Sequence, residues 1–261
     1  MGPVSCGLFA SGVFRCAERS CTMTPIVQCG HALRATEGDL MEKRYFEYGD
    51  EEIAYLKAKD KRLAEVIERI GFIEREVHTD VFQSLIDSII AQQISGKAAQ
   101  TVWNRMVEGL GEVTPERIAA APIEELQQFG MTFGKARYIH NAGERVAAGE
   151  LDLEALREKP DEEVCRDLCA LDGIGVWTAE MLMIFSLQRK DILSFGDLGI
   201  QKGMRMVHHH RRIPRDLFEK YRRRYAPYNS VASLYFWEVA GGALEDMKDY
   251  APKRKQQKKR S

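Results

Sequence analysis

The segment Leu171–Glu180, which reads LDGIGVWTAE, constrains the fold of this chain more than any other feature. It places the tripeptide Gly173–Gly175 between two apolar runs with helical spacing. Glycine adopts positive φ angles at low cost and has no side chain that would block an approaching ligand. The backbone amides at the start of the second helix can then face a phosphate group, assisted by the helix dipole. The segment therefore predicts two helices joined by a tight turn with an anion-binding end.

Apolar residues recur at helical spacing through most of the chain after residue 41. The expected helices span residues 50–70, 80–90, 97–110, 114–121, 123–129, 134–148 and 161–171, followed by the run that begins at Trp177. Asp50 is the expected N-cap of the first helix and Gly71 its expected stop. Strand-like alternation is confined to a short stretch at residues 44–48. Short loops between these helices indicate an all-α fold.

Charge is distributed unevenly along the chain. The net charge is −1, yet residues 201–261 hold 16 Lys and Arg against 6 Asp and Glu. This asymmetry favours one basic face or tail on an otherwise acidic protein, and the alternative is a solvated basic segment without a partner. No apolar run approaches the roughly 18–20 residues that a membrane span needs.

Both ends of the chain differ in composition from its middle. Residues 1–40 are rich in Gly, Ser, Thr, Cys and Pro and show no period, so we expect a disordered or non-native leader, with Met41 as the alternative natural start. A domain is expected at residues 41–250 and a basic tail at 251–261.

The spacing of the cysteines and of the consecutive histidines does not match a metal site. Cys16, Cys21, Cys29 and His31 match no zinc spacing. Cys165 and Cys169 lie one helical turn apart, which rarely suits a disulfide, so we expect reduced thiols in the cytoplasm or, in a eukaryote, the nucleus. Three consecutive residues, His208–His210, cannot converge on one ion because helical neighbours point about 100° apart. They are expected to form a polar turn near phosphate-binding Arg222, Arg223 and Arg224.

Asp197 stands at the entry of a further helical run, downstream of the glycine turn. A glycine hairpin followed at this distance by such an Asp resembles the helix–hairpin–helix family of DNA base-excision glycosylases. The run Ile89–Ala99 is similar to a signature of the alkylation-repair branch, the 3-methyladenine DNA glycosylase II type. The resemblance covers roughly residues 45–242. The chain departs from the family at two positions: Gly196 stands where the family often has Pro, and Val176 stands where it often has Arg.

This resemblance implies an all-α fold of two subdomains with the active-site cleft between them, without the N-terminal sheet domain of the bacterial type. One subdomain would combine residues 41–90 with 197–250, and the other would hold 91–196. The implied site comprises catalytic Asp197, a base pocket of Trp177, Trp237, Tyr235 and Met181, a DNA-binding hairpin of Gly173, Ile174, Gly175 and Thr178, a wedge at Phe133, and the additional motif residues Gln92, Gln93, Ser95 and Lys97.

The chemistry of base excision suits these residue types. An alkylated purine is already cationic and leaves as a neutral base, so one carboxylate, Asp197, can suffice to stabilise an oxocarbenium-like sugar. Asp is also a good N-cap, and both roles can hold. A cationic base is attracted to electron-rich rings such as those of Trp177 and Trp237. The alternative for Phe133 is packing between helices, and Trp103 is expected in the core.

The expected partner is double-stranded DNA with damaged bases, bound by a monomer without membrane contact. No cofactor or metal is expected, with a monovalent cation at the hairpin as the one candidate ligand. Trp177 occupies the position where bifunctional family members carry Lys, so no lyase activity is expected. No Cys follows Cys169, which argues against an iron–sulfur cluster. The alternatives are a glycosylase for hypoxanthine or an oxidised base, and a non-catalytic hairpin module that binds duplex backbone.

Overall fold

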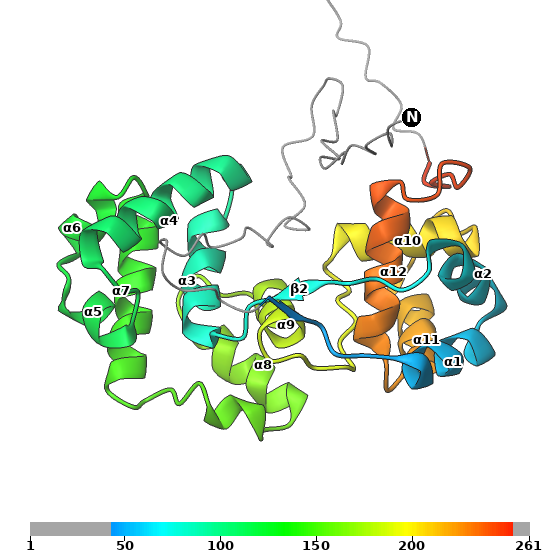
Figure 1. Ribbon diagram of the computed structural model, residues 1–261, viewed down its shortest axis with the longest axis horizontal. Coiled ribbons are helices and arrows are strands. Elements are labelled where there is room, and N and C mark those ends of the chain that lie inside the picture. Colours follow the sequence, from blue (N-terminus) through cyan, green and yellow to red (C-terminus); the bar gives the residue numbers. More distant parts are fainter. Residues whose placement is uncertain (1–42, 253–261) are drawn as a thin grey trace, which may run out of the picture.

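The computed structural model describes residues 43–252, and most of them lie in helices joined by short turns (Figure 1). Two short strands, β1 (Arg44–Tyr45) and β2 (Glu76–Val77), pair antiparallel. The helices are α1 (Asp50–Lys59), α2 (Lys61–Ile70), α3 (Val81–Ala91), α4 (Gly96–Leu110), α5 (Pro115–Ala120), α6 (Ile123–Gln128), α7 (Phe133–Ala147), the 3-10 turn η2 (Ala155–Arg157), α8 (Asp161–Cys169), α9 (Val176–Phe185), α10 (Leu198–His208), α11 (Arg215–Tyr225) and α12 (Asn229–Gly241). The all-helical prediction is confirmed. The expected leader at 1–40, with its four cysteines and His31, lies outside the described residues, as does most of the basic tail.

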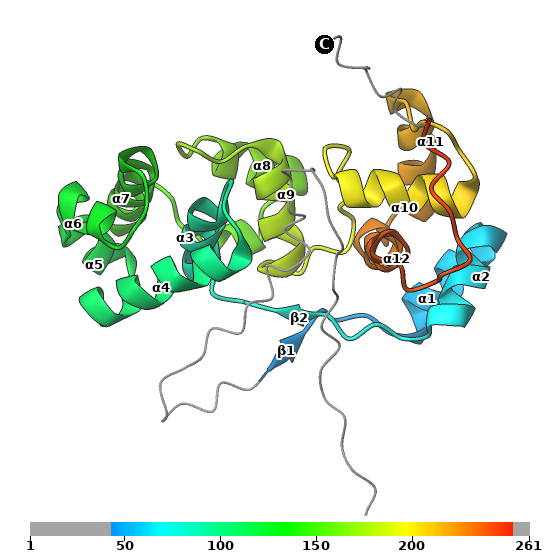
Figure 2. The same cartoon turned by 90° about the horizontal axis from the view of Figure 1, so that it is seen from above.

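The helices form two groups that lie side by side in both views (Figures 1 and 2). One group, the middle subdomain, holds α3 to α9, and the other, the terminal subdomain, holds α1, α2 and α10 to α12. The chain passes between them in residues 71–80, which include β2, and again in residues 186–197. None of the described helices is long and apolar enough to span a membrane.

The expected boundary between the subdomains was residue 90. In the structure the boundary lies ahead of α3. Helix α3 packs against α4, α7 and α9 of the middle subdomain. Its side chains Leu85, Ile86, Ile89 and Ile90 are completely buried. Because α3 is apolar on more than one face, it needs covering on several sides, and the middle helices provide that cover.

The expected single helix over residues 50–70 is two helices, divided at Asp60. The Asp60 carboxylate accepts hydrogen bonds from the backbone N–H groups of Arg62 and Leu63, so it caps α2. Gly49, and not Asp50, is the N-cap residue of α1, whereas Gly71 ends α2 as predicted.

The terminal subdomain is built around α12, which is almost entirely buried and packs on α10. Gly203 of α10 lies against the α12 backbone: a Cβ at this position would lie 2.1 Å from the carbonyl oxygen of Phe236. The glycine allows the two helices to approach closely, and this contact fixes the middle of α10 relative to the middle of α12.

Candidate functional site

Asp197 lies at the junction of the two subdomains, where the connecting segment ends and α10 begins. It is 6 % exposed. Its Oδ1 accepts the backbone N–H of Ile200 at 2.7 Å, so the predicted N-cap role is confirmed. The cap fixes the carboxylate at one position relative to α10.

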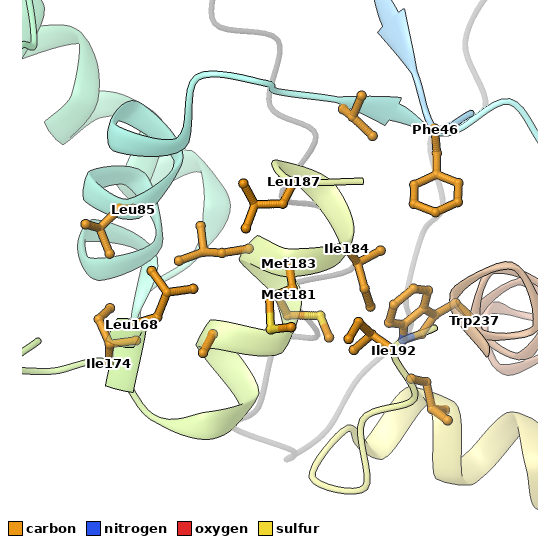
Figure 3. Close-up of a cluster of buried hydrophobic side chains, with 14 of the residues drawn as sticks. Phe46, Leu85, Leu168, Ile174, Met181, Met183, Ile184, Leu187, Ile192 and Trp237 are labelled. Carbon is orange, nitrogen blue, oxygen red and sulfur yellow. The ribbon is translucent and has the colours of Figure 1, made fainter. Parts of the chain in front are cut away.

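Two tryptophans that lie far apart in the sequence meet at this carboxylate. The indole Nε1–H of Trp177, in α9, donates to Asp197 Oδ2 at 2.9 Å. The Nε1–H of Trp237, in α12, donates to Asp197 Oδ1, also at 2.9 Å. Figure 3 shows Trp237 entering the buried apolar cluster from its helix. A buried carboxylate needs such donors to offset the loss of its hydration.

Gly199, which sequence reasoning missed, allows this arrangement. A Cβ at residue 199 would lie 2.8 Å from Trp237 Cδ1 and 3.1 Å from Asp197 Oδ1. Any larger residue would therefore push the indole ring or the carboxylate away. A glycine two residues after the Asp was the available signal.

The glycine turn joins α8 to α9 as predicted. Gly173 has φ +81°, and a Cβ there would lie 2.5 Å from the Tyr138 ring. Gly175 is the exposed N-cap residue of α9 and supplies no side-chain cap. The first-turn amides of α9 are thus without a capping side chain, as in helix ends that bind phosphate.

The other two expected hairpin residues have a different role. Ile174 is 6 % and Thr178 8 % exposed. Figure 3 shows Ile174 beside Leu168 and Leu85, where it anchors the turn to the apolar cluster. Their side chains thus pack inward, so a contact with DNA at these two residues would have to come from the backbone, and their place in a DNA-binding hairpin stays a prediction.

Comparison with known proteins assigns the family. The model of the HhH-GPD superfamily of base excision DNA repair proteins matches residues 86–227, which include the hairpin, Asp197 and Trp177. The chain belongs to this superfamily.

Several proteins that are similar to this chain are named as 3-methyladenine DNA glycosylases or glycosidases. The chain is 31 % identical over 164 residues to DNA-3-methyladenine glycosylase 1 of Schizosaccharomyces pombe, a match that covers 61 % of this chain and 72 % of the yeast protein. A crystal structure of DNA-3-methyladenine glycosidase from Bacillus halodurans has a TM-score of 0.72 at 37 % identity and covers 78 % of this chain and 95 % of that one. The S. pombe 3-methyladenine DNA glycosylase in complex with abasic DNA has a TM-score of 0.65 at 27 % identity, covering 76 % and 100 %.

Tyr235 does not belong to the HhH-GPD site, contrary to expectation. Its side chain is completely buried, and its hydroxyl donates to the carbonyl of Gly71 at 3.1 Å. Burial raises the pKa of this hydroxyl far above its usual range. Two residues along a helix turn by about 200°, so Tyr235 and Trp237 leave α12 on opposite faces. Met181 is buried in the same cluster as Trp237 (Figure 3).

The residues that were predicted as an additional motif lie in the turn between α3 and α4 and, for Lys97, in the first turn of α4. Gln92 Nε2 donates to the carbonyl of Gly173 at 2.8 Å, so it holds the two turns together. Ser95 caps α4. Gln93, with φ +59°, and Lys97 are exposed. The motif thus combines structural residues with two side chains that face solvent.

Lys135, which sequence reasoning missed, also fixes this turn. Its Nζ donates to the carbonyls of Ile90 at 2.7 Å and Gln92 at 2.5 Å, at the end of α3. Burial lowers the pKa of this ammonium group. The start of α7 is thereby tied to the hairpin through Gln92.

Glu180 is a second acidic group in this region that sequence reasoning missed. Its Oε2 accepts the hydroxyl of Ser194 at 2.5 Å, which ties α9 to the segment that carries Asp197. Burial raises the pKa of Glu180; Arg215 opposes the rise and the charge of Asp197 adds to it. Its position one helical turn after Trp177 was the available signal.

Of the three histidines, His209 and His210 follow the end of α10 as expected of a turn, whereas His208 is the last residue of α10 and is buried. His208 is 3 % exposed and shares a hydrogen bond of 2.8 Å with the hydroxyl of Tyr225. Arg224 pairs with Asp60 at 2.5 Å and is therefore not available for phosphate in the way expected. This cluster holds α2, α10 and α11 together.

Among residues 43–252, no group of three or more His, Cys, Asp or Glu side chains lies where it could hold a metal ion. Cys165 and Cys169 are free, half-buried thiols. The monovalent cation at the hairpin stays a prediction.

Replacing Gly175 with Leu is expected to weaken binding to damaged and undamaged duplexes alike, by roughly 10-fold, the scale of one lost hydrogen bond. No atom lies within 4 Å of a Cβ at this position and the backbone is extended, so folding is unaffected while the side chain blocks the amides. Gly49→Leu, at the equally open start of α1, is the matched control. A stable Gly175→Leu protein with unchanged affinity would show that the hairpin is merely structural.

Phe133→Ala tests the wedge. Phe133 is the first residue of α7 and is 58 % exposed, so the alternative of packing between helices is wrong, and the wedge role stays a prediction. Unstacking a base costs a few kcal/mol, part of which a wedge returns, so excision from paired duplex should fall about 10-fold with little change in Tm. Phe72→Ala, 59 % exposed, is the control. A Tm loss typical of a core Phe, without a specific loss of excision, would exclude the role.

Proposed function

We propose that this chain is a monomeric DNA glycosylase that hydrolyses the N-glycosidic bond of alkylated purines, of the 3-methyladenine and 7-methylguanine type, in duplex DNA. The carrying observation is the carboxylate of Asp197, held by two indole N–H groups beside the α9 hairpin. The names of the relatives support alkylated bases as the substrate class. A purely backbone-binding module would need Asp197 only as the N-cap of α10, whereas here both carboxylate oxygens also accept an indole N–H group.

The reaction follows from this arrangement. The hairpin amides would bind the DNA backbone while the target nucleotide leaves the stack and enters the site. The bond between the anomeric carbon and the base nitrogen breaks, and its electron pair leaves with the base. A base that was cationic departs neutral. Water then forms the new bond to the anomeric carbon and gives up a proton to solvent.

Asp197 would act by charge. A fixed negative group in a site with little water stabilises the positive sugar much more than the same group in bulk water does. The N-cap and the indole donors hold the carboxylate in place, so it need not reorganise when the charge develops.

Base release without strand cleavage is the expected product. Trp177 stands where bifunctional relatives carry Lys, and an indole cannot attack the sugar as an amine does. A duplex labelled on the lesion strand should therefore stay intact after incubation and break only in hot alkali. Cutting without alkali, together with a borohydride-trapped protein–DNA adduct, would contradict the absence of lyase activity. Release of hypoxanthine or an oxidised base, and not an alkylated purine, would support the rival lesion classes.

A further inference from the structure

We infer that Trp177 and Trp237 are positioning residues that hold the Asp197 carboxylate in its reactive orientation through their indole N–H groups. The inference rests on the proposed function. It goes beyond a role for the two rings as surfaces that face a cationic base, because it assigns the function to the N–H edge and not to the ring face.

The hydrogen bonds divide the two carboxylate oxygens. Oδ1 accepts from Ile200 N and from Trp237 Nε1, whereas Oδ2 accepts from Trp177 Nε1. A carboxylate has about four acceptor positions. The described residues fill both acceptor positions of Oδ1 and one of Oδ2, so the second acceptor position of Oδ2 remains for another donor. The structure therefore assigns Oδ2 as the oxygen that faces the sugar or the attacking water, with Trp177 controlling its direction.

The two donors come from different subdomains. Trp177 is in α9 of the middle subdomain, and Trp237 is in α12 of the terminal subdomain, while Asp197 ends the segment that connects them. The carboxylate orientation hence depends on how the subdomains sit against each other. Glu180 in α9 and Arg215 in α11 are the charged side chains nearby: Glu180 interacts electrostatically with both Asp197 and Arg215.

Trp177→Phe and Trp237→Phe separate the N–H edge from the ring face, because phenylalanine keeps an aromatic face and loses the donor. A hydrogen bond to a charged group is worth about 1.5–3 kcal/mol, so each variant should lower kcat roughly 10- to 100-fold. Affinity for abasic duplex should not change.

Trp103→Phe is the matched control. This third tryptophan of the chain is 4 % exposed and lies in the core of the middle subdomain. The activity of its Phe variant therefore shows how much is lost when a buried Trp is replaced by Phe away from Asp197. In an Asp197→Asn background, Trp177→Phe should cost little further activity because the charge that it orients is gone.

An activity-independent measurement separates this inference from the proposed function. In the free protein, Asp197→Asn should shift the indole N–H resonances of Trp177 and Trp237 in a nitrogen–proton NMR spectrum, while that of Trp103 stays in place. Unchanged resonances would overturn the inference even if the wild type releases bases. So would Phe variants that change lesion preference alone, with kcat as in the wild type. A wild type that releases no base, with the resonance shifts present, would instead contradict the proposed function.

Discussion

Replacing Asp197 with Asn is expected to lower base excision about 100-fold or more while DNA binding is retained. Loss of one preorganised electrostatic stabiliser has this scale in other enzymes. Asn is nearly as good an N-cap as Asp, and its oxygen can still accept the N–H of Ile200. The variant therefore keeps the cap and removes the charge that opposes the oxocarbenium-like sugar, together with the hydrogen bond that Oδ2 accepts from Trp177.

Single-turnover excision from a lesion-bearing duplex measures this effect. Asp80→Asn is the matched control, because Asp80 caps α3 in the same way by accepting the N–H of Gln83 at 2.8 Å and is exposed. That variant should excise at the wild-type rate. Near-normal turnover of Asp197→Asn would end the catalytic assignment, and unfolding of the variant would show that the cap needs the charge.

Acid is expected to destabilise the terminal subdomain through His208. Burial lowers the pKa of the His208 imidazole to about 3, with the nearby charge of Asp60 opposing that shift. Unfolded His has a pKa of about 6.5. Between these values the unfolded chain binds a proton that the folded chain does not, so the free energy of unfolding falls as pH falls from about 6.5 towards 3.

The size of this effect is on the order of 5 kcal/mol over the whole window, at about 1.4 kcal/mol for each pH unit. Asp60 adds to this loss of stability only below about pH 3.8. Its pKa is lowered in the folded protein, so the stability that its charged form contributes is lost as the pH falls below that value. Urea unfolding at several pH values between 7 and 4 measures the slope.

Two variants decide whether His208 causes this slope. His208→Gln cannot gain the proton, so its unfolding free energy should depend less on pH even though it is lower at pH 7. His209→Asn is the control, because this neighbour is exposed and Asn tolerates the left-handed backbone found there, with φ +57°. Equal slopes in the wild type and His208→Gln would contradict the account.

The parts of the fold that were predicted correctly depend on local patterns. Helical periodicity located most helices, and the glycine turn located the hairpin between α8 and α9. The division at Asp60 was missed, because capping interrupts a pattern whose apolar spacing continues across it. The helix α3 was located correctly in the sequence but assigned to the other subdomain, since only tertiary packing decides which neighbours cover a helix that is apolar on several faces.

In the site, too, local patterns identified residues, but they did not identify the contacts that depend on the tertiary fold. Asp197 and both tryptophans were predicted as members, yet their hydrogen bonds were not, because no local pattern relates α9 to α12. Tyr235 was misassigned by proximity to Trp237 in sequence, although a two-residue step turns the side chain to the opposite face. Glu180 and Lys135 were missed because their partners, Ser194 and the end of α3, are brought to them by folding alone.

Chromatography of bases released from methylated duplex DNA tests the central claim most directly. The wild type should release 3-methyladenine and 7-methylguanine as free bases, in amounts that rise with time and enzyme concentration, and Asp197→Asn should release little of either. Release of no purine base by the folded wild-type protein, under conditions in which it binds the duplex, would contradict the account.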